Sequence, residues 1–130
     1  MTGAASATRI RYEIASSDLY KNVTCFHELA RFKRIYLIEF GDMNAGGAVR
    51  KIGYIDLMAI LDPQNLRRQG GAEGLYDMPF VTIENVEIVD ATHIIVGNDN
   101  NLPFSSSRDP NRADDNELVL LEVEALLKAK

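Results

Sequence analysis

The stretch FVTIENVEIVDATHIIVGN, from Phe80 to Asn98, decides the fold. It contains two runs rich in branched apolar residues, Phe80 to Val89 and Thr92 to Asn98, separated by Asp90-Ala91. Two such runs joined by a very short turn are typical of an antiparallel hairpin. The stretch therefore predicts two paired β-strands.

Similar runs on either side extend this pattern. KRIYLIEF, from Lys33 to Phe40, is apolar on both faces and predicts a central strand, and GDMNAGG then supplies turn residues. VRKIGYIDL, from Val49 to Leu57, predicts the returning strand of a second hairpin. Further strands are expected at Arg9 to Ile14 and Glu117 to Glu124. Five or six strands in hairpins predict an all-β antiparallel fold.

Only short helical turns are expected. Ser17-Asp18 is a potential cap for a helix or turn reaching Glu28. Asp56 is expected to cap one helical turn over Leu57 to Leu61, and Asp62-Pro63 to begin another. The final ALLKAK predicts a terminal turn.

Composition limits the classes of function. The 130 residues are 46% hydrophobic, which suits one domain with a modest core. The net charge of -5 and the scattered basic residues argue against binding to nucleic acid. The best basic cluster, Arg31, Lys33 and Arg34, is interpreted as a solvated strand end, with an anion site as the alternative. Cys25 is expected to be a small buried apolar residue. No segment suits an export signal or a membrane span, so no membrane partner is expected.

The segment from Gly97 to Glu117 is unusually rich in Asn and Asp for a connection between two strands. Carboxylate and amide oxygens are ligands that Ca²⁺ prefers, but the helix-loop-helix calcium pattern fails, because Phe104 stands where that pattern needs Gly. A metal would need ligands from both ends, such as Asp99 with Asp114 or Asp115. The alternative is a structural turn, since Asn and Asp cap their own turns.

Charged residues near this loop add two further candidates. Arg108 and Arg112 are suited either to neutralising the carboxylates or to binding a phosphate oxygen. Glu84 lies among apolar residues and is expected to point inward, where a buried carboxylate needs a partner or a metal.

Three segments together resemble the C-terminal part of phytase-like proteins with phytase esterase-like activity, which form a β-propeller family. They are RFKRIYLIEF, VRKIGYIDLMAILDP and the stretch from Pro79 to Val123, so the likeness covers Arg31 to Val123. Its most specific part is the run NDNN followed by P, S, R and DDNE after a strand. The resemblance implies antiparallel hairpins equivalent to the last one or two blades of a propeller. It divides the chain into residues 1–30, an N-terminal extension or poorly determined segment, and a partial phytase-like domain at 31–130.

The resemblance also implies a function, a C-terminal fragment of a phosphoester hydrolase with a bound divalent cation, calcium. The expected partner is a small phosphorylated or ester substrate, and exposed edge strands predict homo-oligomers. The alternative is a non-catalytic propeller remnant or a binding module. Relatives are often exported, and the location of this chain is not predicted. The implied catalytic residues are Glu84, Asp99 and Arg108, and the implied metal ligands are Asn98, Asp99, Asn101, Asp114 and Asp115.

Overall fold

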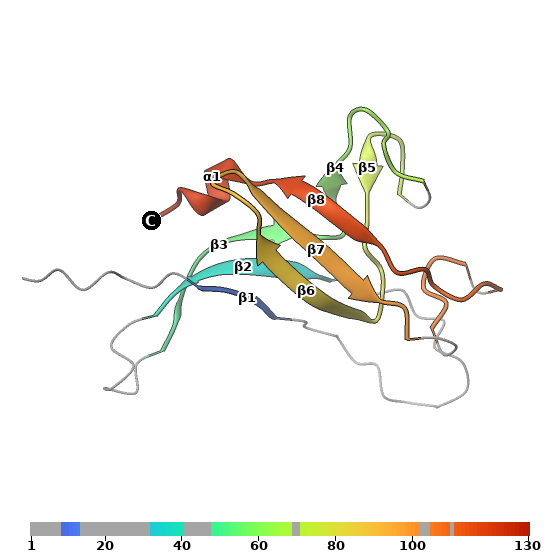
Figure 1. Ribbon diagram of the computed structural model, residues 1–130, viewed down its shortest axis with the longest axis horizontal. Coiled ribbons are helices and arrows are strands. Elements are labelled where there is room, and N and C mark those ends of the chain that lie inside the picture. Colours follow the sequence, from blue (N-terminus) through green and yellow to red (C-terminus); the bar gives the residue numbers. More distant parts are fainter. Residues whose placement is uncertain (1–8, 14–31, 41–47, 69–70, 102–104, 110) are drawn as a thin grey trace, which may run out of the picture.

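The computed structural model describes residues 9–13, 32–40, 48–68, 71–101, 105–109 and 111–130. Eight strands and one short helix follow one another in these residues (Figure 1). They are β1 (Arg9–Glu13), β2 (Arg34–Glu39), β3 (Arg50–Asp56), β4 (Ile60–Leu61), β5 (Leu75–Tyr76), β6 (Thr82–Ile88), β7 (His93–Asp99), β8 (Leu118–Glu122) and α1 (Glu124–Leu127). This confirms the all-β antiparallel class, while the propeller arrangement stays a prediction.

The first sheet has the order β1-β2-β3, with both pairs antiparallel. Tyr36 of β2 stands opposite Tyr54 of β3, and their ring centroids lie 5.9 Å apart. Cross-strand aromatic pairs of this kind stabilise a sheet. The predicted hairpin from Lys33 to Leu57 is thus confirmed, and its turn lies outside the described residues.

The second sheet has the order β6-β7-β8 and contains the hairpin that the opening stretch predicts. Asp90 closes the turn, because its Oδ1 accepts hydrogen bonds from the backbone N–H groups of Thr92 and His93 at 2.7 and 2.8 Å. Donation from Thr92, first by its N–H and then by its hydroxyl, holds the pKa of Asp90 below its ordinary value. The turn has four residues, 89–92, rather than the expected two, and the Asp90 carboxylate fixes its backbone.

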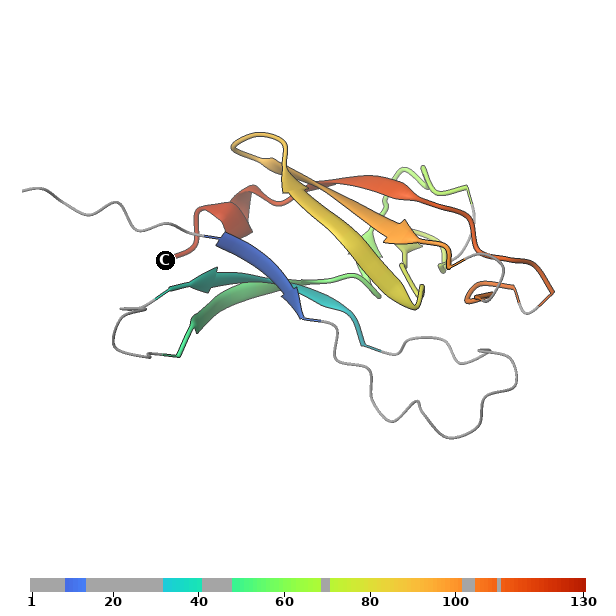
Figure 2. The ribbon, with the colours of Figure 1, turned by 60° about the horizontal axis from the view of Figure 1, so that its bottom comes forward.

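The core lies between the two sheets, which face each other in Figures 1 and 2. Ile35 of β2 contributes from one side, and Ile94 and Val96 of β7 from the other, all with no exposed surface. Met78 and Phe80, on the segment entering β6, are also fully buried in this cluster. Alternation along β2 and β7 places these side chains inward, so burial of apolar surface holds the sheets together.

Asp56 and Asp62 each begin a turn, as expected, but neither turn is helical. The Asp56 carboxylate does accept a hydrogen bond, from the Met58 N–H at 3.0 Å, but a non-helical turn follows and leads into β4. Asp62 accepts bonds from the N–H groups of Leu66 and Arg67 at 2.8 and 3.0 Å, again without a helix. The chain instead forms a ribbon, because Ile60–Leu61 pairs with Leu75–Tyr76. The expected C-terminal turn is confirmed as α1.

The first 30 residues are described only at β1, which confirms the strand expected from Arg9 to Ile14. The predictions for Ser17 to Glu28, including Cys25, lie outside the described residues. Among the described helices, none is long and apolar enough to cross a membrane.

Candidate functional site

The Asn/Asp-rich loop between β7 and β8 is fastened where it leaves and rejoins the sheet. The side-chain oxygen of Asn98 accepts a hydrogen bond from the Glu117 N–H at 2.7 Å, and its amide nitrogen donates to the Asp115 carbonyl at 3.1 Å. The Asn100 N–H donates to the side chain of Asn116 at 2.8 Å. Asn101 has a φ of 48°, a left-handed conformation that Asn tolerates well. These asparagines therefore shape the loop.

Asp114 is a second structural centre, which we call the Asp114 clasp. Its Oδ2 accepts hydrogen bonds from the hydroxyls of Ser105 and Ser107 at 3.0 and 2.7 Å. Its Oδ1 accepts from the N–H groups of Ser107 and Arg108 at 2.7 and 3.4 Å. Asp114 and both serines are buried, so the carboxylate is satisfied within the loop.

Arg108 forms a third centre, the Arg108 clamp, with its side chain only 9% exposed. Its guanidinium donates to the side chain and carbonyl of Asp77 at 2.9 and 2.6 Å, and to both carboxylate oxygens of Glu117 at 3.2 and 3.1 Å. It lies 5.1 and 4.9 Å from the ring centroids of Tyr76 and Phe80. The Tyr76 hydroxyl also donates to Glu117; burial, then that hydrogen bond, raises the pKa of Tyr76. The clamp ties the loop to the entrance of β6.

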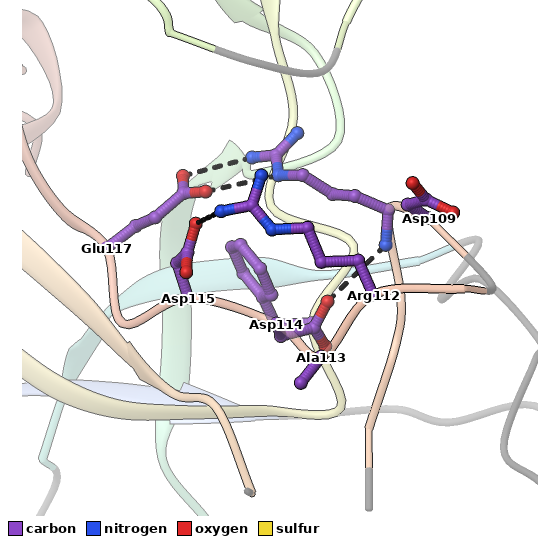
Figure 3. Close-up of a pocket in the computed structure, with 8 residues that line it drawn as sticks. Asp109, Arg112, Ala113, Asp114, Asp115 and Glu117 are labelled. Atoms are coloured by element: carbon purple, nitrogen blue, oxygen red, sulfur yellow. Dashed lines mark hydrogen bonds and ion pairs between the residues drawn. The ribbon is translucent and has the colours of Figure 1, made fainter. Parts of the chain in front are cut away.

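A small cavity lies between the clamp and the clasp, with a volume of about 10 Å³, roughly the room for one water molecule (Figure 3). At its rim Arg112 reaches Asp115, with an N–O distance of 2.7 Å (Figure 3). Both of these side chains are exposed. This cavity is too small for an ester substrate.

Lys33 overturns the interpretation of a solvated strand end. Its side chain is buried, with 2% of the residue exposed, and its Nζ has no hydrogen-bond partner among the described residues. Burial lowers the pKa of Lys33 to about 8, and the Asp114 carboxylate opposes part of this shift. A local charge pattern cannot reveal that another part of the chain will cover this amine.

A larger groove lies between β8 and the β4–β5 ribbon, with a volume of about 830 Å³. This is within the usual range of small-molecule pockets. Two walls carry exposed leucines, and Arg67, Arg68, Asp115 and Glu117 supply charge. Asp115 lines both this groove and the small cavity. The remaining lining residues are Leu61, Asp62, Leu66, Tyr76, Asn116, Leu118, Val119 and Leu120.

The expected inward role of Glu84 is wrong. Ile83 stands opposite Asn98 and Asn85 opposite Gly97, so Glu84 is an extra residue in a β-bulge and is exposed. Ile83 is buried, so alternation along the strand points Glu84 to the solvent side, and the bulge leaves Asn85 exposed as well. Neither Glu84 nor Glu87 is buried.

The other predicted site residues lie along one loop but have separate partners. Asp99 is exposed and accepts a hydrogen bond from the Asn101 N–H at 3.2 Å, while Asp114 and Asp115 bind the groups described above. Within the described part of the chain, no three His, Cys, Asp or Glu side chains gather as a metal site. Sequence reasoning missed Lys33, Asp77 and the leucine-lined groove.

The two facing sheets, the fastened loop and the groove define an all-β protein with a ligand-sized depression beside a polar loop. The chain belongs to the phytase-like family: the family model described as "Phytase-like: Esterase-like activity of phytase" matches residues 20–102. The match begins upstream of Arg31 and ends before most of the Asn/Asp-rich loop. Comparison with curated proteins and with solved structures gave no match.

Proposed function

We propose that the chain hydrolyses phosphoesters and that the groove between β8 and the ribbon holds the substrate. The observation that carries this proposal is the match to the phytase-like family over more than half of the chain. The groove supports it, since it is the ligand-sized depression that adjoins the Asn/Asp-rich loop. The implied substrate is a small phosphate ester, and other esters belong to the same proposal.

Two side chains of the groove have chemistry suited to this reaction. Arg68 is exposed and can bind a phosphate oxygen, because a guanidinium pairs well with phosphate geometry. Asp115 is an exposed carboxylate held by Arg112, and in this proposal it accepts the proton of an attacking water. Arg108, the phosphate contact expected from the sequence, is instead engaged by Asp77 and Glu117.

Calcium dependence is a separate part of the proposal. The family resemblance implies it, but both oxygens of Asp114 and both polar side-chain atoms of Asn98 already have partners within the protein. No step is therefore assigned to a metal. The proposal that the two sheets are part of a larger propeller also rests on the resemblance alone.

The test is release of 4-nitrophenol from 4-nitrophenyl phosphate by the purified chain, with and without added Ca²⁺. Asp115→Asn removes the proton acceptor and is expected to lower kcat by at least about 100-fold, the usual contribution of a general base. Glu122→Gln is the matched control, because Glu122 is an exposed carboxylate on β8 that does not line the groove. Equal rates for both variants would reject Asp115 as the proton acceptor, and no release at any Ca²⁺ concentration would reject the hydrolase.

The second candidate is a binding module without catalysis. It is favoured because the clasp binds the carboxylate of Asp114, an expected metal ligand, and the clamp binds the guanidinium of Arg108, an expected catalytic residue. In this case the exposed edge strands pair with a second copy, and β6, which ends at the exposed Ile88, is one such edge. Light scattering is expected to show a dimer or larger assembly, and a monodisperse monomer would contradict pairing.

A further inference from the structure

The walls of the groove expose large apolar side chains that the core does not use. Leu61 of β4 is 80% exposed, and Leu66, in the turn after it, is 76% exposed. Across the groove, Leu118 and Leu120 of β8 are 71% and 58% exposed. Isolated exposed leucines are normal, but four that face one another across a groove form a patch suited to an apolar ligand.

Each carboxylate that lines the groove is paired with an arginine, while one arginine of the groove has no carboxylate partner among the described residues. Asp62 lies 3.8 Å from Arg67, and Glu117 is held by Arg108. Arg112 reaches Asp115 from outside the groove. Among the described residues, no carboxylate lies within ion-pair distance of Arg68, which is exposed at the groove. A ligand with one anionic group complements this arrangement.

We infer that the groove binds an amphiphilic phosphoester, a single phosphate head at Arg68 attached to an alkyl chain that lies over Leu61, Leu66, Leu118 and Leu120. This ligand is the substrate class that we assign to the proposed hydrolase, so the inference rests on the proposed function. A compact, highly phosphorylated polyol fits less well, because it needs several unpaired cations and gains nothing from the leucines. The anionic head also distinguishes this ligand from a purely apolar strand of another chain.

The experiment measures binding of hexyl, octyl and decyl phosphonates by isothermal titration calorimetry, below their micellar concentrations. Phosphonates keep the anionic head and cannot be hydrolysed at the ester. Affinity is expected to rise roughly two- to four-fold for each added CH₂, as partial to full burial of a methylene predicts. Decanol, which lacks the head, and inositol hexakisphosphate, which lacks the tail, are expected to bind more weakly than decyl phosphonate.

Two variants separate the head from the tail. Arg68→Gln is expected to weaken decyl phosphonate binding about tenfold or more, the effect of losing a charged hydrogen bond. Leu120→Ser is expected to flatten the dependence on chain length. Both positions are exposed, so the fold is not at risk. Arg50→Gln is the control, because Arg50 is exposed on β3 and pairs with Glu39 away from the groove.

The inference is overturned if affinity does not depend on chain length, if Arg68→Gln binds as well as the wild type, or if inositol hexakisphosphate binds most tightly. No binding by a protein that light scattering shows to be dimeric also overturns it and indicates a second copy in the groove. Chain-length-dependent binding without any turnover would reject only the hydrolase. Turnover of 4-nitrophenyl phosphate without such binding would reject only the amphiphilic ligand.

Discussion

The buried amine of Lys33 yields a prediction whose size follows from the structure. The pKa of Lys33 falls from 10.5 to about 8, mainly because burial penalises the charged form. At 1.36 kcal/mol for each pKa unit, keeping the ammonium charged in the fold costs about 3 kcal/mol at neutral pH. Methionine has a stem of similar length and no charge to bury. We therefore expect Lys33→Met to stabilise the protein at pH 7 by about 2–3 kcal/mol.

The sign of the pH dependence follows from proton uptake. The unfolded chain keeps the Lys33 proton up to about pH 10.5, whereas the folded chain releases it near pH 8. Between these values the unfolded state binds more protons, so this group makes the folded protein more stable as pH rises. The advantage of Lys33→Met is therefore expected to shrink between pH 8 and pH 10.5 and to vanish above that range.

The assay is urea unfolding followed by far-ultraviolet circular dichroism at pH 7 and pH 10, for the wild type and Lys33→Met. Lys51→Met is the matched control for the loss of a lysine from this sheet, because Lys51 is exposed on the neighbouring β3. A Lys33→Met protein less stable than the wild type at pH 7 would show that the buried ammonium does not destabilise the fold. So would a stability difference that is the same at both pH values.

Three further predictions concern the loop and the groove. Arg108→Met leaves Glu117 as a partly buried carboxylate without its cation. We therefore expect the free energy of unfolding, measured with urea, to fall by about 3 kcal/mol. A loss below about 1 kcal/mol would contradict a stabilising role for the Arg108 clamp. The hydrogen bond donated by the Leu66 N–H is the main cause that lowers the pKa of Asp62. The Asp62 carboxylate should therefore hold this turn at pH values above the ordinary pKa of a carboxyl group. The hydrogen bond should be lost only as the pH falls below that value. The Leu66 amide proton signal should report this in an NMR titration, and a midpoint at or above the ordinary carboxyl value would be inconsistent. The resemblance also predicts that millimolar Ca²⁺ raises the melting temperature and that Asp99→Asn abolishes the rise; an unchanged melting temperature would reject a calcium site in the loop.

Local sequence patterns predicted the strands because the signals are local. The alternation of Phe80 to Asn98 and the short turn within it determine the pairing of β6 with β7, since register in a hairpin follows the turn. The bulge at Glu84 was not predictable in this way. One inserted residue changes which side chains point inward, and nothing in the run TIENVEI marks the insertion.

The candidate site was less predictable because it depends on contacts between distant residues. Arg108 meets Asp77, 31 residues earlier in the chain, and no local pattern links the two. The same holds for Lys33, whose burial beside Asp114 needs two segments that are far apart in sequence. The groove is formed by β4, the segment after it and β8, which are far apart in sequence. The leucines of these segments therefore come together only when the chain folds, and their grouping could not be predicted.

The most direct test of the proposed activity is the release of inorganic phosphate from decyl phosphate by the wild type, Asp115→Asn and Glu122→Gln. The wild type and the Glu122 variant are expected to release phosphate, and the Asp115 variant to release it at least about 100-fold more slowly. Failure of the wild-type protein to release phosphate, with a cooperative melt showing that it is folded, would contradict the assignment of phosphoester hydrolysis to this chain.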